Sequence, residues 1–276
     1  MKSEYYGEYY EHENNHWWFT WRFDMITRIV QSLPRSDGFR MLDAGCGTGQ
    51  MTILLEQFGE AIGLEIAPEA LAFARRRGVK NLVQGSITDP PFAAGSFDLV
   101  LSLDVIEHVD NDVQIINSLF DIVKPGGHLI VTVPAFQSLW SEHDEINHHK
   151  RRYRVKQLTA MFEDAGFEVG RIAYCNSVLF LPVFITRKVK TLLRWFRDRE
   201  RIAGPESDLA HYPAPINNLL YRILTTETRL MRRWSLPFGV SILAVAQRPL
   251  TSARPDTVDI DSLIADALPQ RVFAAQ

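Results

Sequence analysis

The chain has 276 residues, 46% of them hydrophobic, which is enough to bury one substantial core. Its formal net charge of -3 gives no overall basic character, so we expect no nucleic-acid partner. Its two cysteines, Cys46 and Cys175, cannot form a disulfide framework and indicate a reducing compartment. The N-terminal residues resemble no secretory signal, and no apolar run reaches the ~18 residues of a spanning helix. We therefore predict a cytoplasmic protein.

The first notable element is an aromatic run, HWWFTWRFDMITRIV, which contains Trp17, Trp18, Phe19 and Trp21. Aromatic side chains bury large areas and can close a pocket while stacking on planar ligands. We predict a helical cap over residues 1–38. A helix that covers a ligand cleft and a helix that is docked on a sheet for structural reasons remain equally open.

Between Arg40 and Pro134 short apolar runs alternate with helical patterns, which is typical of a parallel sheet with crossover helices. The predicted strands cover residues 40–44, 61–66, 82–85, 98–103 and 128–133. The predicted helices cover residues 49–58, 68–77 and 112–123. The KPGG segment at 124–127 is predicted to stop the third helix and to turn the chain into the fifth strand.

Beyond this core we predict a helix at 155–165, a sixth strand at 169–174 and a last strand at 240–246. The segment 176–237 is too long for a plain loop and is expected to hold helices. The polar tail, with a weak helical signal at 260–268, is expected to be disordered. The predicted division is a cap at 1–38, a core at 39–175, a helical insertion at 176–237, the last core strand at 238–249 and a tail at 250–276.

Three glycines with G-x-G-x-G spacing, Gly45, Gly47 and Gly49, follow the first strand and open a helix. Glycines here let the backbone approach a ligand closely. The dinucleotide fingerprint G-x-G-x-x-G is the main alternative, but Gln50 stands at its third glycine position; the G-K-[ST] ending of a phosphate loop is missing. Glu65 ends the second strand, where a carboxylate can accept both ribose hydroxyls or remain a solvated charge. Asp43 can meet a cofactor's ammonium group or cap the turn.

Five ordered blocks carry a resemblance to a known family: MLDAGCGTG, GLEIAPEAL, QGSITDPPF, SFDLVLSLDVIEHV and VKPGGHLIVTVP. In this order they resemble class I S-adenosylmethionine (SAM)-dependent methyltransferases. The resemblance implies an α/β, Rossmann-like fold with a seven-stranded, mostly parallel sheet, an antiparallel last strand and helices on both faces. A helical insertion would precede the last strand.

The resemblance also implies SAM as the cofactor and assigns residues to it. The glycines and Asp43 would frame the methionine portion, and Glu65 would hold the ribose. The remaining cofactor-binding residues would be Ile66 beside the adenine, Ser86 and Ile87 against its ring, and Asp104 after the fourth strand.

The segment HDEINHHKRRY lies just beyond the fifth strand, at the ligand-facing end of the expected sheet. It resembles the HD-x4-H-x-RRY block of a bacterial subgroup of these enzymes, which matches His143, Asp144, His149, Arg151, Arg152 and Tyr153. This subgroup often begins with an aromatic segment, which implies a helix over the cofactor cleft. We predict His149 and His143 as catalytic residues, with His149 as a general base. A purely structural role for Arg152 and Tyr153 is an equal alternative.

Two segments contain residue types that can bind a metal ion. The two predicted catalytic histidines and the carboxylate of the segment HDEINHHKRRY lack the spacing of zinc sites. Residues 104–108, DVIEH, are similar to the E-x-x-E-H segment of ubiquinone-biosynthesis O-methyltransferases, which has been linked to a divalent metal, but the first position here is Asp104. We predict a turn that closes over SAM, and no metal.

The segment 179–201 combines an apolar face with seven Lys or Arg between Arg187 and Arg201, against two acids. It is predicted as a lid helix or, alternatively, as a peripheral contact with the inner face of the membrane. The predicted function is methyl transfer from SAM to a small-molecule or lipid-linked acceptor, at oxygen. N- or C-methylation, a non-catalytic SAM-binding protein and an NAD-dependent oxidoreductase are the alternatives.

Overall fold

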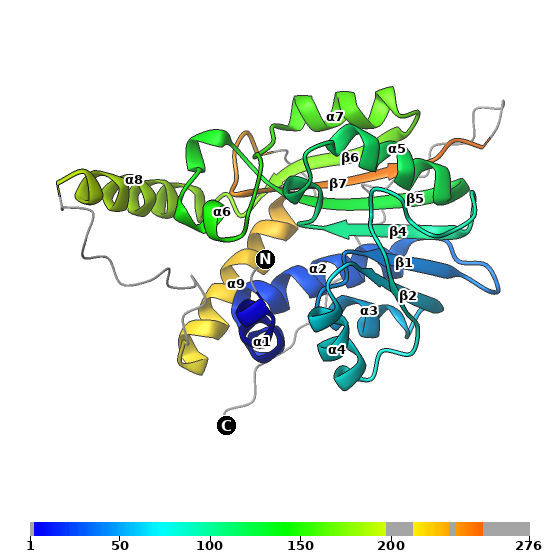
Figure 1. Cartoon of the computed structure of the whole chain (residues 1–276). Helices are drawn as coiled ribbons and strands as arrows, with labels where there is room; N and C mark the ends of the chain where they lie inside the picture. The colour runs from blue at the N-terminus through cyan, green and yellow to red at the C-terminus, as the bar shows by residue number, and fades with distance from the viewer. Residues whose placement is uncertain (1–2, 197–211, 232–235, 251–276) are drawn as a thin grey trace.

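A computed structural model describes residues 3–196, 212–231 and 236–250 (Figure 1). It contains a seven-stranded sheet with the order β3-β2-β1-β4-β5-β7-β6. The strands are β1 (Arg40–Ala44), β2 (Glu60–Glu65), β3 (Leu82–Gln84), β4 (Phe97–Leu103), β5 (Val123–Pro134), β6 (Glu168–Cys175) and β7 (Ser241–Gln247). Strands β1 to β5 pair in parallel, whereas β7 runs antiparallel to both β5 and β6. This topology confirms the predicted Rossmann-like fold and its antiparallel last strand.

Hydrophobic side chains alternate between the two faces of the central strands, because successive strand residues point to opposite sides. On β1, Met41 belongs to one core cluster and Leu42 to the other, and both side chains are fully buried. The first cluster lies under α2 (Trp17–Ser32), α3 (Gln50–Leu55) and α9 (Ala214–Met231). The second lies under α5 (Asp112–Ile122) and α7 (Val155–Asp164). Helices therefore cover both faces, as expected for a parallel sheet.

Two details differ from the sequence prediction. Helix α3 ends at Leu55, three residues before the predicted end at residue 58. The KPGG segment does not precede the fifth strand, because β5 already begins at Val123. Pairing with β4 then jumps from Phe97–Val123 to Leu99–His128, so residues 124–127 form an irregularity within β5. Gly126 has φ 80°, a value that favours glycine and lets the strand bulge there.

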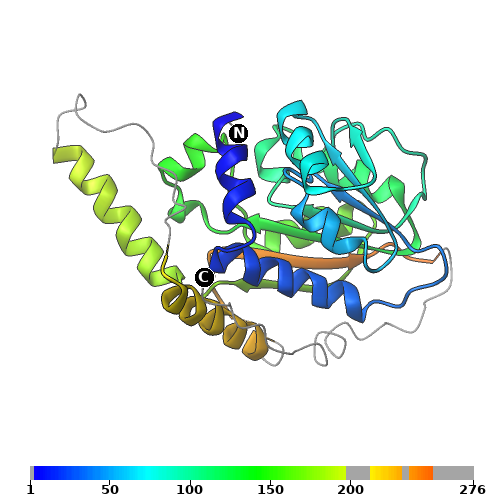
Figure 2. The same cartoon turned by 90° about the horizontal axis from the view of Figure 1, so that it is seen from below.

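The N-terminal helices cover one end of the sheet. Helix α1 (Ser3–His12) lies against α4 (Pro68–Arg77), and α2 lies beside α9 (Figures 1 and 2). The Trp21 indole Nε1 donates to Thr228 Oγ1 at 2.9 Å, and the Tyr221 hydroxyl donates to Asp24 at 2.6 Å. Residues some 200 positions apart in sequence therefore build one wall, which places the cap and the insertion next to each other.

The insertion forms α8 (Phe180–Phe196) and α9, and α8 extends away from the body of the molecule (Figure 2). Within the described part of the chain, no helix is long and apolar enough to cross a membrane. The predicted tail beyond residue 250 and the end of the basic segment, 197–201, lie outside the described residues. The division into cap, core, insertion and tail stays a prediction.

Candidate active site

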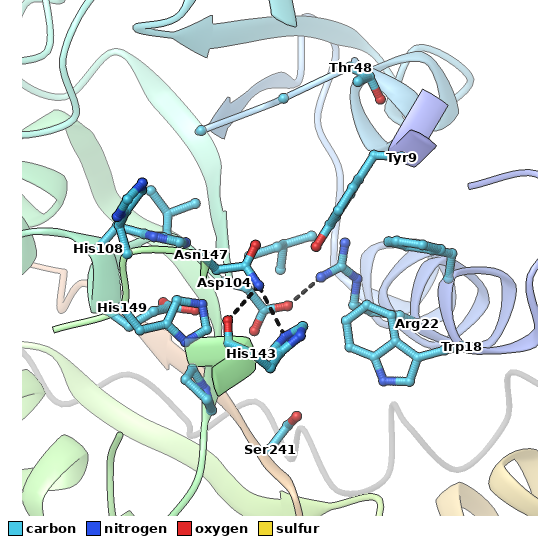
Figure 3. Close-up of a pocket in the computed structure, with 18 of the residues that line it drawn as sticks. Tyr9, Trp18, Arg22, Thr48, Asp104, His108, His143, Asn147, His149 and Ser241 are labelled. Atoms are coloured by element: carbon cyan, nitrogen blue, oxygen red, sulfur yellow. Dashed lines mark hydrogen bonds and ion pairs between the residues drawn. The ribbon is translucent and has the colours of Figure 1, made fainter. Parts of the chain in front are cut away.

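A cavity of about 590 Å³ opens at the carboxyl ends of β1, β2 and β4. This is the edge at which open α/β sheets bind ligands. Helices α1 and α2 cover it on one side, and the loop that follows β5 and the start of α8 cover it on the other (Figures 1 and 3). Most of the residues that the sequence singles out line it: Gly45, Gly47, Glu65, Ile66, Ser86, Ile87, Asp104, His143 and His149.

The glycine turn forms one wall of the cavity. The backbone amides of Gly45 and Cys46 both donate to the Leu64 carbonyl, at 2.8 and 3.0 Å, which fixes the turn beside β2. A Cβ on Gly45 would clash with Val105, and its φ is 88°. Gly47 has φ 54°, and a Cβ there would meet no atom within 4 Å. The backbone of Gly47 therefore borders open space that a ligand can fill.

Glu65 is buried and locked in orientation by two backbone donors. Its Oε2 accepts from the Gly47 amide at 3.1 Å, and its Oε1 accepts from the Ala67 amide at 2.9 Å. Each carboxylate oxygen keeps a further acceptor site, so the pair can still receive two hydroxyl donors. Beside it Ile66 is 65% exposed, although it is a large apolar residue that lines the cavity. An exposed aliphatic face next to a fixed carboxylate suits a flat base attached to a ribose.

Asp43 and Gly49 are not among the residues that line the cavity. Asp43 is buried and accepts a hydrogen bond from Thr52 Oγ1 at 2.6 Å, so its side chain ties β1 to α3. Burial raises the pKa of Asp43 to about 6, although Thr52 and Arg22 oppose the shift. Gly49 packs against α4: a Cβ would come within 2.8 Å of Ala74 Cβ. At these two positions the residues therefore contact neighbouring helices and do not border the cavity.

Arg22 reaches the cavity from α2 and forms an ion pair with Asp104, the residue that follows β4 (Figure 3). Asp104 itself has φ 56°, a left-handed conformation uncommon for a residue with a side chain. The Arg22 guanidinium also lies 4.7 Å from the Trp18 ring centroid and 5.3 Å from that of Phe23. Sequence reasoning missed Arg22. The available signal was a cation within the aromatic run WWFTWRF.

A second missed group connects α1 to the glycine turn. Glu13 accepts a hydrogen bond from the Thr48 hydroxyl, and Arg77 of α4 donates to it at 2.7 Å. Burial raises the pKa of Glu13, while Thr48 and Arg77 favour the carboxylate. This buried trio fixes the N-terminal segment over the cavity, which supports the interpretation of α1 and α2 as a cover. Because the core face of α2 is also buried in the first hydrophobic cluster, both interpretations of the aromatic run apply.

The opposite wall carries the histidine segment. The ring Nδ1 of His149 lies 2.9 Å from Asp144 Oδ1, and Arg152 donates to the same carboxylate at 2.8 and 3.1 Å. Asp144 also closes a capping box at Ser141, which fixes the short helix α6 (Glu142–Ile146). Burial alone would raise the pKa of Asp144, but His149 and Arg152 hold it well below its usual range. An ionised, immobile carboxylate therefore orients the His149 ring.

The other members of the motif are placed differently. His143 lines the cavity, and its ring contacts Asn147 at 3.3 Å (Figure 3). Tyr153 is fully buried in the core, away from the cavity, and its hydroxyl donates to Asp112 at 2.9 Å. Arg151 pairs with the same aspartate at 2.9 Å. These contacts give Tyr153 and Arg151 structural positions, whereas Arg152 lines the cavity and orients Asp144.

In the part of the chain that the structure describes, Glu107, His108 and His149 form a cluster that could hold a metal ion, with ligand atoms within 4.8 Å of one another. Among the described residues, neither carboxylate oxygen of Glu107 has a hydrogen-bond partner. Burial and the charge of Asp104 raise the pKa of Glu107 well above its usual range, which favours the neutral acid. Burial lowers the pKa of His108 to about 4, with His149 adding to the effect. A neutral Glu107 can donate to a ligand, and the absence of a metal remains a prediction.

Comparison with known proteins identifies the family of the chain. The family model described as a methyltransferase domain matches residues 42–131, which contain the glycine turn, Glu65 and Asp104. A relative from Methanocaldococcus jannaschii, an uncharacterized protein, is 34% identical over 160 residues, covering 58% of this chain and 67% of its own length. A relative named as a probable SAM-dependent methyltransferase, from Mycolicibacterium smegmatis, is 30% identical over 162 residues. The chain belongs to the class I SAM-dependent methyltransferase family. Members of this family are enzymes that use SAM as the methyl donor.

Further matches show how much of this chain and of each related protein the similarity covers. A ubiquinone biosynthesis O-methyltransferase from Xanthomonas axonopodis is 29% identical, over 49% of this chain and 65% of that protein. The matched region spans about three fifths to two thirds of these curated relatives. A solved methyltransferase in complex with the Trm112 activator of Haloferax volcanii superposes with a TM-score of 0.58 at 18% identity, covering 91% of this chain and 97% of that one. At this identity the superposition supports the fold alone.

Proposed function

We propose that this chain transfers the methyl group of SAM to an oxygen atom of a small-molecule or lipid-linked acceptor. One observation carries the proposal. A single cavity has the glycine turn and Glu65 on one wall and His149, which contacts the buried Asp144 behind it, on the other. A donor and an acceptor held in this way would meet between the two walls.

The donor fits the first wall. Glu65 would accept the ribose hydroxyls, and the exposed face of Ile66 would pack against the adenine. The opposite charges of Arg22 and Asp104 suit the carboxylate and the ammonium of the methionine end, each of which can replace one partner of the existing ion pair. If the cavity walls were neutral, the carboxylate and the ammonium of the methionine end would be desolvated and unpaired.

The acceptor side needs orientation and a proton acceptor. The methyl group of a sulfonium is already activated, so the main tasks are to align the acceptor oxygen with the methyl carbon and to exclude water. With Nδ1 committed to Asp144, His149 has Nε2 available to receive the hydroxyl proton as the oxygen–carbon bond forms and the carbon–sulfur bond breaks. An amine acceptor, if already neutral, would need no such base. The oriented histidine therefore favours oxygen over nitrogen.

The test of donor binding is calorimetric titration of the full chain with SAM, S-adenosylhomocysteine and NAD. We expect binding of the first two and none of NAD. Glu65→Gln should weaken SAM binding about tenfold to a hundredfold, because hydrogen bonds to a charged group contribute about 1.5–3 kcal/mol. Glu69→Gln is the matched control, since Glu69 is an exposed residue of α4. Preference for NAD would overturn the proposal, and SAM binding without consumption across an acceptor panel would indicate a non-catalytic binding protein.

A further inference from the structure

Helix α8 presents an apolar stripe to solvent. Val178, just before the helix, and Leu181, Ile185 and Val189 within it are 53%, 61%, 50% and 48% exposed. Their spacing of three or four residues places them on one side of the helix. The opposite side packs inward, where Phe180 contacts the rings of Phe136 and Phe238. The stripe is therefore a separate face and not the edge of the core.

The exposed apolar residues are concentrated in this part of the molecule. Seven of the eleven exposed large hydrophobic side chains in the described residues belong to the stripe or to α9, where Ile216, Leu219 and Leu230 are 44%, 59% and 58% exposed. Helices α8 and α9 lie at the same end of the molecule (Figures 1 and 2). Single exposed apolar residues are ordinary, whereas a concentration of this kind marks an interaction surface.

In the described parts of the same two helices, the exposed charged residues are all basic. Lys188 and Lys190 of α8 and Arg222 and Arg229 of α9 are exposed. The acidic residue in the described parts of these helices, Glu227, is buried and accepts from the backbone amides of Ser177 and Val178 at 2.7 and 2.9 Å. The chain as a whole is acidic, with a net charge of -3. On these two helices exposed basic residues thus stand beside exposed apolar side chains, a combination suited to an anionic lipid surface.

We propose that the outer faces of α8 and α9 dock on an anionic membrane, with the stripe among the lipid headgroups and the basic residues on their phosphates. This inference rests on the proposed function and specifies the lipid-linked branch of it. The inner side of α8 contributes Val183 and Arg187 to the cavity wall, and Leu179, just before the helix, lines it as well. The same helix therefore separates the bilayer from the acceptor side of the cavity, and an acceptor carried on a lipid would enter along it.

The experiment is co-sedimentation of the full chain with two kinds of vesicle, phosphatidylglycerol mixed with phosphatidylcholine, and phosphatidylcholine alone. We expect binding to the anionic vesicles and its loss at high salt. Lys188→Gln with Lys190→Gln should weaken binding about 30-fold, because each basic residue near an anionic surface contributes about 1 kcal/mol. Leu181→Ser with Ile185→Ser should weaken it at least about tenfold. The matched controls, Val113→Ser on α5 and Lys156→Gln on α7, replace exposed residues elsewhere and should bind as the wild type does.

The outcomes separate this inference from the proposed function. Failure of the wild type to bind anionic vesicles, with SAM binding intact, would overturn the membrane inference alone. Equal loss in the controls would overturn it as well, because binding would then not depend on this face. A dimer in light scattering that Leu181→Ser with Ile185→Ser dissociates would assign the face to a second copy of the chain. Absence of SAM binding would instead remove the proposed function.

Discussion

At the residue scale, each wall of the cavity depends on a carboxylate that is fixed in place. Glu65 and Asp144 are both fixed by hydrogen bonds before any ligand binds, so neither has to be ordered during binding. Preorganisation of this kind reduces the cost of aligning reactants. Within the described residues the carboxylate of Glu107 has no such partner, so a ligand bound beside it would supply one.

His149→Ala tests the proposed base. We expect turnover to fall by about a hundredfold to ten-thousandfold, the usual contribution of general acid–base catalysis, while the affinity for SAM measured by titration stays unchanged. His143→Ala is the comparison, because His143 lines the same cavity without the Asp144 contact shown by His149. Near-normal turnover of His149→Ala with the true acceptor would exclude His149 as the base.

The sequence could predict the residues of the cavity that lie in local motifs. Gly45 and Asp104 directly follow β1 and β4, and Glu65 is the last residue of β2. Gly47 lies in the short turn after β1, so strands and short loops fix the place of all four residues. Arg22 and Glu13 could not be predicted, because their roles depend on how α1 and α2 dock on a sheet formed by later residues. Asp43 shows the opposite limit: the motif singles it out as a cofactor-binding residue, yet in the structure its side chain contacts Thr52 and does not line the cavity.

At the element scale, the ion pair between Glu13, just after α1, and Arg77 of α4 ties the N-terminal segment to the core. Glu13→Gln leaves the Arg77 guanidinium without its carboxylate, a change that typically costs about 3–5 kcal/mol for a buried pair. We expect α1 to detach. In hydrogen exchange, the amides of residues 3–12 should lose protection while those of β1 and β4 keep it. Uniform loss of protection would show that α1 and the sheet unfold together.

The regular elements were well predicted where an apolar run or a helix signal is local. Helix α4 begins at Pro68 and ends before Gly78, which adopts φ 96° as a left-handed cap, and β1 has the predicted bounds. The bulge in β5 was missed because it depends on pairing with β4. The docking of α9 beside α2 could not be predicted for the same reason, because no local sequence pattern indicates which distant helix will pack against α2.

At the scale of the whole molecule, buried neutral histidines make the fold sensitive to acid. Burial lowers the pKa of His128 to about 4, below the value near 6.5 expected in the unfolded chain. The unfolded state therefore binds the proton first, and the stability present above pH 6.5 is lost as the pH falls through 4. His128→Leu should reduce the loss between pH 7 and 4.5 by about 2–3 kcal/mol in chemical denaturation. Parallel curves for variant and wild type would contradict this account.

The position of β7 has a consequence for how the sheet assembles. Within the seven-stranded sheet, β6 pairs with β7 alone, and β7 is separated from it in sequence by the whole insertion. During synthesis, β6 has no strand partner and the edge of β5 is open until residues 241–247 leave the ribosome. Open edges and distant pairings slow folding and expose the chain to wrong contacts. Helices α8 and α9 precede β7 in the sequence and can form during this interval. The nascent chain could therefore associate with a lipid surface through them before its sheet is complete.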